Sequence, residues 1–231
     1  MKKEARSYLI MGLLAFLLLS LEILVILFGP LSYGTQSFFN IFIPQSTALL
    51  INYGIACIIW GVGIYFLYTM AKKRGFNVFE NKSIVPMKNW IIVFIIVILF
   101  LTIFYFSGNM TFKFVEIFNY YGNQGIYVLI GSIIHTFFSS AVILAIIIFF
   151  QEFGELSFKY KNIPWGGIFF IILYGLIFGL SWVMTPYNEY FVLLIRTVIL
   201  LLIISSVYPL LKKNVIYAYP IITLLFFLYG F

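Results

Sequence analysis

Seven long apolar runs fill most of this 231-residue chain and limit its fold more than any motif does. A membrane-spanning helix needs about 20 consecutive apolar residues. Only 9% of the residues are charged, whereas a soluble domain carries roughly a quarter. The sequence therefore predicts an all-α, polytopic transmembrane helix bundle that forms one integral membrane domain over residues 1–231. The predicted spans are 8–29, 46–70, 89–107, 125–150, 165–184, 190–211 and 214–230.

Lysine and arginine residues fall on alternating sides of these runs. Twelve of the 14 lie at the N-terminus or in the connections after the second, fourth and sixth runs. The opposite connections hold only Lys113, and Arg196 lies inside a span. Because basic connections stay in the cytoplasm, we predict a multi-pass protein of the cell membrane with a cytoplasmic N-terminus. Only residues 212–214 separate the last two runs, so two full crossings and a re-entrant hairpin both stay open.

The basic clusters at helix ends suit anionic lipid headgroups, so we predict membrane lipid as a partner and no nucleic acid. The first run is too long for the apolar region of a signal peptide, and no A-x-A site follows it, so we expect it to remain as a helix. Aromatic side chains in the connections 30–45 and 108–124 indicate that these segments lie on the outer membrane surface. The single cysteine, Cys57, cannot form an internal disulfide.

Three ionisable residues within the runs carry the strongest functional signal. Glu22 in the first run and Arg196 in the sixth lie at similar depth, and His135 in the fourth lies near that depth. Opposite charges inside a membrane tend to pair or to face water. We predict that Glu22 and Arg196 meet in the outer half of the bundle and that His135 can join them, either as a structural ion pair or as a polar pocket that opens outward.

Glu152 and Glu155 form a second candidate site at the cytoplasmic end of the fourth run. Their spacing places both carboxylates on one face if the helix continues. They are either ordinary neighbours of Lys159 and Lys161 or a catalytic carboxylate pair, and the first interpretation is favoured.

Motifs for metal or hydrolase chemistry are poor. One His, one Cys and no Asp leave little from which to build a zinc site, so we predict no metal and no cofactor. The sequence also lacks H-E-x-x-H, G-x-S-x-G and a phosphate-binding glycine loop. Glycines within the runs are predicted to allow close helix packing. They are Gly61, Gly63, Gly175 and Gly179, the last two in a G-x-x-x-G motif.

Three segments in residues 140–230 appear in the order found in a known family. They are FFQEFGELSFKYKNIPWGGI, LYGLIFGLSW and VYPLLKKNVIYAYPII. Together they resemble the glutamate helix with its basic turn, the first histidine segment and the turn before the last catalytic helix of the CAAX-protease and bacteriocin-processing (CPBP) intramembrane metalloproteases. The resemblance implies a CPBP-like fold for this half of the chain.

The family's catalytic residues do not accompany this pattern. Aligned on Trp165, the Glu-Glu-x-x-x-Arg motif falls on Ile146, Ile147 and Gln151, and a five-residue shift recovers only Glu152. The first histidine position is Trp182, and the last helix offers Thr223, Leu224 and Leu225 in place of the second histidine. Water activation in such an enzyme needs metal ligands and a general base. The resemblance therefore implies a degenerate pseudoprotease.

We expect a non-catalytic scaffold that binds a membrane, exported or cell-envelope protein. Two alternatives stay open. The first is an active CPBP-type peptidase that uses Glu152, Glu155 and His135, although a continuous helix would separate His135 from Glu152 by roughly 25 Å. The second is a small-molecule binding subunit or transporter component with Glu22, Arg196 and His135 lining its pocket.

Overall fold

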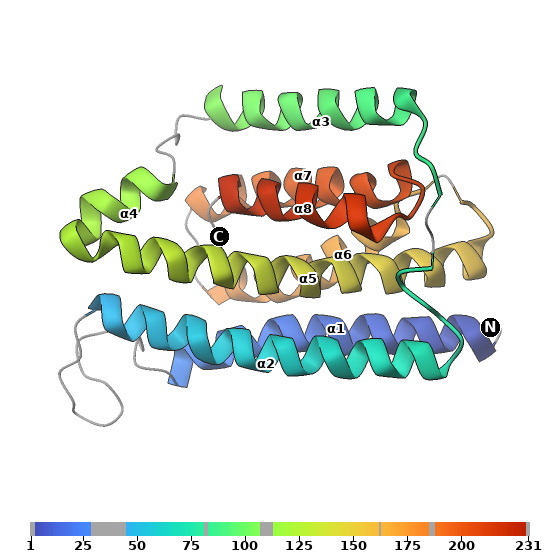
Figure 1. Cartoon of the computed structure of the whole chain (residues 1–231), viewed down its shortest axis with the longest axis horizontal. Coiled ribbons are helices and arrows are strands. Elements are labelled where there is room, and N and C mark those ends of the chain that lie inside the picture. The colour runs from blue at the N-terminus through green and yellow to red at the C-terminus, as the bar shows by residue number, and fades with distance from the viewer. Residues whose placement is uncertain are drawn as a thin grey trace.

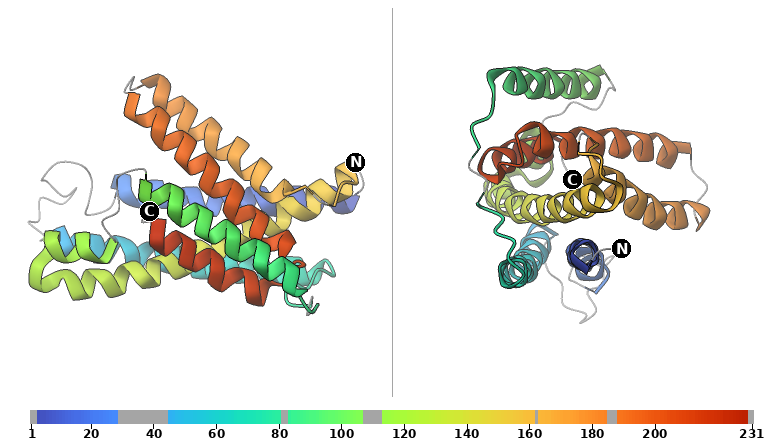
Figure 2. Two further views of the ribbon diagram at one scale, coloured as in Figure 1. Left: turned by 90° about the horizontal axis from the view of Figure 1, so that it is seen from above. Right: turned by 90° about the vertical axis from the view of Figure 1, so that its right-hand side faces the viewer.

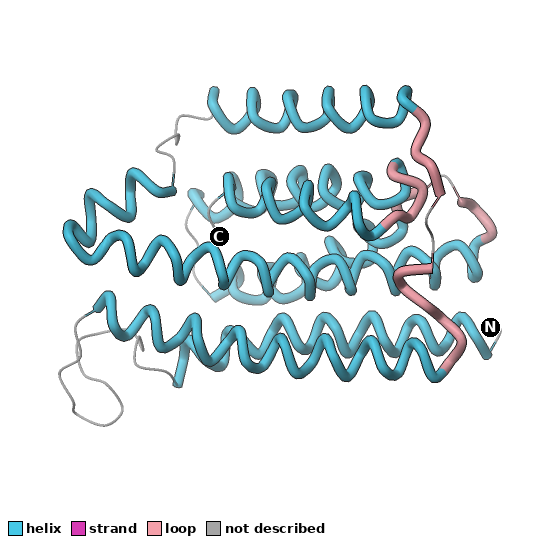
Figure 3. Tube along the Cα trace, in the orientation of Figure 1, coloured by secondary structure: helices cyan, strands magenta, loops and turns pink. Residues whose placement is uncertain are grey.

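The structure is a computed structural model in which the described ranges of the chain form helices and contain no strand (Figure 3). These ranges are 3–28, 45–80, 83–106, 113–161, 163–184 and 188–229. The helices are α1 (Lys3–Phe28), α2 (Gln45–Lys73), α3 (Met87–Phe106), α4 (Lys113–Tyr121), the 3₁₀ turn η1 (Gly122–Gln124), α5 (Gly125–Phe158), α6 (Trp165–Met184), α7 (Asn188–Leu210) and α8 (Val215–Tyr229).

α5 is the central helix of the bundle. It packs against α1, α2, α6 and α8, and Figure 1 shows it between the α1–α2 pair and the α7–α8 pair. Its residues 142–150 are all apolar, and all but Ala145 are buried, with Val142, Ile146, Ile147 and Phe150 at most 1% exposed. A helix that is hydrophobic all round belongs in a core or a membrane. This helix therefore organises the rest of the fold.

The bundle has two distinct ends. One end contains the start of α1, the end of α5 and the α7–α8 turn (Figure 1). We call it the basic end, because its turns contain Lys159, Lys161, Lys212 and Lys213. The other end, called the opposite end, holds η1 and the start of α5. α4 folds back along α5 at the opposite end, where the sequence predicted an aromatic connection without a helix.

Close packing by glycine is confirmed in α2 and not found at Gly175. A Cβ atom at Gly63 would lie 2.4 Å from Leu18 of α1, and one at Gly61 would lie 3.2 Å from Phe138 of α5. At Gly175 no described atom lies within 4 Å of such a Cβ. The surroundings of Gly179 are not among the described parts of the structure. The small residues of α2 therefore allow α1 and α5 to approach it.

α3 is the outermost helix. It packs mainly against α7, and Figure 2 shows it apart from the rest of the bundle. Its start is fixed by Asn89, whose Nδ2 donates to the Leu210 carbonyl over 2.6 Å, and by Trp90, whose ring lies 5.3 Å from that of Tyr217. Much of the remainder is exposed apolar surface, with Phe94 65% exposed. Such a surface suits contact with lipid.

The helices match the predicted runs closely, with α5 continuing to Phe158, beyond the predicted end of its span. In the described ranges three helices, α1, α2 and α5, are long and apolar enough to cross a membrane, and α3, α6, α7 and α8 contribute shorter apolar segments. α8 has 15 residues, which gives it a length of roughly 22 Å against roughly 30 Å for a bilayer core. A full crossing by α8 therefore stays a prediction.

Candidate functional site

Two clusters of polar side chains lie on α5, one toward each end of the bundle. His135 belongs to the first and Glu152 to the second, and the unbroken helix between them separates the two residues by roughly 25 Å. One active site cannot use both side chains at this separation. We therefore describe them as two sites, the His135 site and the carboxylate clasp.

The His135 site joins α1, α2 and α5. His135 Nε2 lies 2.8 Å from Glu22 Oε1, and the imidazole ring packs against the rings of Tyr53 and Trp60 at 4.4 Å and 4.9 Å. Trp60 is held in turn, because its Nε1 donates to the Leu18 carbonyl of α1 over 3.2 Å. The structure thus brings together Glu22 and His135, which the sequence placed at similar depth.

The predicted pair of Glu22 and Arg196 stays a prediction, because the side chain of Arg196 lies outside the described residues. α7, which carries Arg196, packs mainly against α6, α3 and α8, whereas α1 packs against α2 and α5. Figure 2 shows α6 and α7 leaning away from α1 toward the opposite end of the bundle. The side chain of Trp182 also lies outside the described residues.

Asn52 is an unusual buried group next to the His135 site. It directly precedes Tyr53 on α2 and is only 4% exposed, and neither atom of its amide has a hydrogen-bond partner among the described residues. Leaving a buried polar group unpaired costs roughly 1–3 kcal/mol. Nearer the end of the helix, Tyr120 donates to Gln45 over 3.2 Å. Polar groups therefore extend along α2 from its start to His135.

The carboxylate clasp consists of Glu152 and Glu155 of α5 with Lys213 of the α7–α8 turn. Lys213 Nζ donates to Glu152 Oε1 over 2.6 Å and to Glu155 Oε2 over 2.9 Å. This geometry corrects the interpretation based on Lys159 and Lys161, since the ion pairs among the described residues connect both carboxylates to Lys213.

The clasp also controls the protonation of its lysine. Burial lowers the pKa of Lys213, but the hydrogen bonds and negative charges of Glu152 and Glu155 outweigh this effect and raise the pKa above its ordinary value. Lys213 has a backbone φ of 59°, a left-handed conformation that a lysine seldom adopts. The turn therefore holds the ammonium group in its charged form against both carboxylates.

Gln151 fastens the clasp to the α5–α6 turn. It is completely buried, and its Nε2 donates to Glu155 Oε1 and to the Ile163 carbonyl, each over 2.9 Å. Its Oε1 accepts a bond of 3.1 Å from the Gly166 amide at the start of α6. Every polar atom of this side chain is therefore partnered. Together with Lys213, Gln151 links α5, α6 and the α7–α8 turn.

The three positions onto which the resemblance places the Glu-Glu-x-x-x-Arg motif, when aligned on Trp165, have structural roles. Ile146 and Ile147 are completely buried in the apolar core, and Gln151 supports the turn as described. Within the described ranges, no group of three His, Cys, Asp or Glu side chains is placed to hold a metal ion. The arrangement thus offers ion pairs and hydrogen bonds rather than a set of metal ligands.

Comparison of the chain with protein-family models, curated proteins and solved structures finds no match.

Sequence reasoning missed several residues of both sites. It counted Lys213 only as a basic residue at a helix end, and it passed over Asn52, Tyr53 and Trp60 as part of an apolar run. Asn52 did offer a signal, since it is an amide among apolar neighbours in the second run. Lys213 offered none, because it is distant in sequence from its partners Glu152 and Glu155.

Proposed function

We propose that this chain is a non-catalytic, multi-pass membrane protein that binds a membrane or exported protein. The observation that carries the proposal is the carboxylate clasp. Three of the four carboxylate oxygens of Glu152 and Glu155 accept hydrogen bonds from Lys213 or Gln151. A general base or a metal ligand needs an available lone pair in a site that substrate can reach. The clasp uses these carboxylates to hold helices together.

The resemblance of residues 140–230 to CPBP proteases supports the same role. A degenerate member retains helices shaped to admit a transmembrane or lipidated segment, and binding such a segment needs only packing and a few polar anchors. In this proposal the basic end faces the cytoplasm of a cell-membrane protein with seven spans.

Affinity purification in a gentle detergent, followed by mass spectrometry of retained proteins, tests this role. The wild type is compared with a neutral clasp variant, Glu152→Gln/Glu155→Gln/Lys213→Met. We expect both forms to retain the same intact partner, because the clasp is structural. A partner that is cleaved by the wild type and intact with the variant would support a peptidase instead. Retention of no protein beyond that of an unrelated membrane protein would contradict partner binding.

Asn52 favours a second candidate function, the binding of a small molecule at the His135 site. Asn52 has a buried amide without a partner among the described residues, and it directly precedes Tyr53, whose ring packs against His135; such an amide suits a ligand with both hydrogen-bond donors and acceptors. Native mass spectrometry should then detect a molecule that is carried through purification and lost in Asn52→Leu and His135→Phe. Asn119→Leu, at an exposed position of α4, is the matched control. Equal spectra for all four proteins would remove this candidate.

A further inference from the structure

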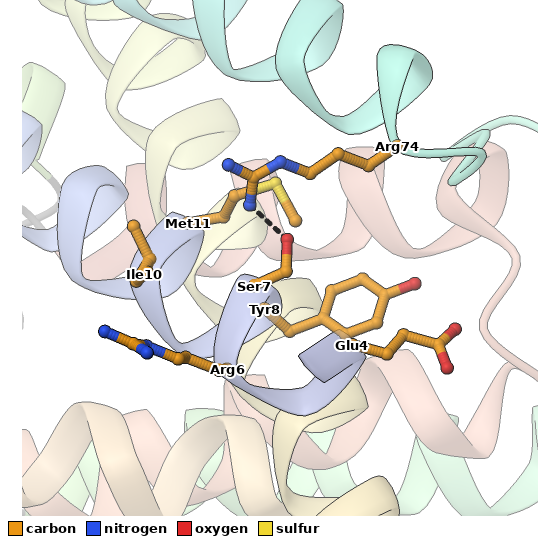
Figure 4. Close-up of a pocket in the computed structure, with 7 residues that line it drawn as sticks. All are labelled: Glu4, Arg6, Ser7, Tyr8, Ile10, Met11 and Arg74. Atoms are coloured by element: carbon orange, nitrogen blue, oxygen red, sulfur yellow. Dashed lines mark hydrogen bonds between the residues drawn. The ribbon is translucent and has the colours of Figure 1, made fainter. Parts of the chain in front are cut away.

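A pocket of about 650 Å³ lies beside the start of α1 at the basic end, and its lining includes none of the residues of the two sites described above. It is open on one side, and α1 provides all of its lining except Arg74, which follows α2 (Figure 4). The lining residues are Glu4, Arg6, Ser7, Tyr8, Ile10, Met11 and Arg74.

The end of α2 positions Arg74 over this pocket. Gly75 has a φ of 80°, the Phe76 amide donates to the Ala71 carbonyl, and the Gly75 amide donates to the Lys72 carbonyl, each over 3.0 Å. These bonds form a Schellman motif, which ends a helix in a fixed geometry. The Phe76 ring then packs edge-on against Tyr8 at a centroid distance of 5.2 Å. Arg74 is therefore held beside α1 by its own turn.

The pocket has the chemistry of a phosphate site. Arg74 Nη1 donates to Ser7 Oγ, which uses one of the five donors of the guanidinium group. Figure 4 shows the Arg74 guanidinium at Ser7 and the Arg6 guanidinium on the neighbouring face of α1, with the Glu4 carboxylate pointing away from both. Guanidinium groups bind phosphate oxygens through paired hydrogen bonds.

An apolar stripe runs along α1 from this pocket toward the middle of the bundle. Ile10, Leu13, Leu14 and Leu17 are between 37% and 59% exposed, and their spacing places them on one face of the helix. Arg6 precedes Ile10 by four residues on the same face. A ligand with a phosphate and long acyl chains would contact the two arginines and the stripe together, whereas free phosphate would use only the pocket.

We propose that this pocket binds the phosphate group of an anionic phospholipid, with an acyl chain lying along Ile10, Leu13, Leu14 and Leu17. Basic groups at the ends of membrane helices attract such lipids in general. Here the Schellman turn, the Ser7 hydroxyl and the stripe define a particular site for one lipid.

Native mass spectrometry of the purified full chain tests the site by titration with phosphatidylglycerol, phosphatidylcholine or glycerol 3-phosphate. We expect preferential binding of phosphatidylglycerol and little binding of glycerol 3-phosphate, which lacks acyl chains. Arg6→Gln/Arg74→Gln should weaken phosphatidylglycerol binding roughly 30-fold, as expected for the loss of two interfacial basic groups. Lys88→Gln/Lys161→Gln removes two exposed charges outside the pocket and should change binding less than threefold.

A variant that keeps both charges separates the loss of a binding contact from a loss of folding. Arg6→Lys/Arg74→Lys should bind phosphatidylglycerol more weakly than the wild type but more tightly than the glutamine variant, because an ammonium group cannot form the paired bonds. The proposal is overturned if phosphatidylcholine binds as tightly as phosphatidylglycerol, or if glycerol 3-phosphate binds as tightly as the lipid. It is also overturned if the pocket and control variants lose affinity equally.

Discussion

The carboxylate clasp and the His135 site are both buried polar clusters on α5, yet they differ in how completely their groups are partnered. In the clasp, Lys213 and Gln151 supply donors to Glu152 and Glu155, and all the polar atoms of Gln151 are bonded. Beside the His135 site, both amide atoms of Asn52 lack a partner among the residues described.

This difference separates a structural role from a binding role. A network in which most polar atoms are partnered favours one arrangement of helices, whereas an unpartnered buried group carries an energetic cost that a ligand can relieve. We infer that the clasp stabilises the bundle. We also infer that a polar ligand group would gain most binding free energy at the His135 site. Substitutions in the two sites should therefore change the free energy of unfolding by different amounts, and in one case in the opposite direction.

The largest effect on the stability of the folded protein is expected from Gln151→Leu. The substitution removes three hydrogen bonds and leaves the buried Gly166 amide unpaired, while the Ile163 carbonyl keeps only its bond from the Trp165 amide; this should lower the free energy of unfolding by about 3 kcal/mol. Thermal and denaturant unfolding in detergent measures the loss. Asn119→Leu, at an exposed amide of α4, should cost less than about 0.5 kcal/mol. Equal losses in the two variants would show that the clasp is not a special structural site.

Lys213→Met should lower the free energy of unfolding somewhat less, by about 2 kcal/mol. It leaves Glu152 and Glu155 without their cation, but the lysine side chain is 26% exposed, so water compensates part of the loss. The same unfolding measurement applies, with Lys161→Met as the exposed control. Adding Glu152→Gln/Glu155→Gln to Lys213→Met should recover most of the stability, and failure to recover it would contradict a charge-based clasp.

The stabilisation by Lys213 should disappear at high pH. Its pKa in the folded protein is raised above the value of about 10.4 for an unfolded lysine, so its contribution is complete below that value and is lost as pH rises through the folded-state pKa. The stability difference between the wild type and Lys213→Met should stay constant from about pH 7 to 9 and shrink above about pH 11. A difference that shrinks already near neutral pH would contradict the raised pKa.

A double-mutant cycle with Glu22→Gln and His135→Phe should give a smaller coupling energy of about 1 kcal/mol. Their polar atoms lie 2.8 Å apart, but the Glu22 side chain is 29% exposed, which weakens the hydrogen bond between them. A second cycle, with Glu22→Gln and Arg196→Met, measures the pair predicted from sequence. Zero coupling in the first cycle would show that Glu22 and His135 do not interact.

The smallest effect, with the opposite sign, is expected from Asn52→Leu. Replacing an unpaired amide by an apolar side chain of similar size should leave the ligand-free protein unchanged or up to about 1 kcal/mol more stable. Unfolding of protein that has been washed free of small molecules provides the measurement. A loss of more than about 1 kcal/mol would show that Asn52 has hydrogen-bond partners, and the contrast with the clasp would then fail.

Much of this fold is predictable from sequence because hydrophobic length is a local property. The apolar runs correspond to α1, α2, α3, α5, α6, α7 and α8, and the depth of Glu22 and His135 was enough to suggest that they are neighbours. The extension of α5 to Phe158 was missed because Gln151, Glu152 and Glu155 interrupt the apolar pattern while packing inside the bundle.

The partners within each site were harder to predict because they depend on tertiary contacts. Glu155 has Lys159 as its sequence neighbour, but it pairs with Lys213 because the α7–α8 turn folds back onto the end of α5. Tyr53 and Trp60 contact His135 because α2 packs closely on α5, where a Cβ atom at Gly131 would lie 3.4 Å from the Tyr53 ring. Periodicity alone gives no information about such contacts.

The most direct test of the non-catalytic account is to measure metal content and peptide-bond cleavage in the same purified protein. Wild type and Glu152→Gln/Glu155→Gln are assayed side by side for bound zinc and for cleavage of lipidated and transmembrane peptides. The account predicts no stoichiometric metal and the same background cleavage in both proteins. Stoichiometric zinc together with cleavage that vanishes in the glutamine variant would contradict it.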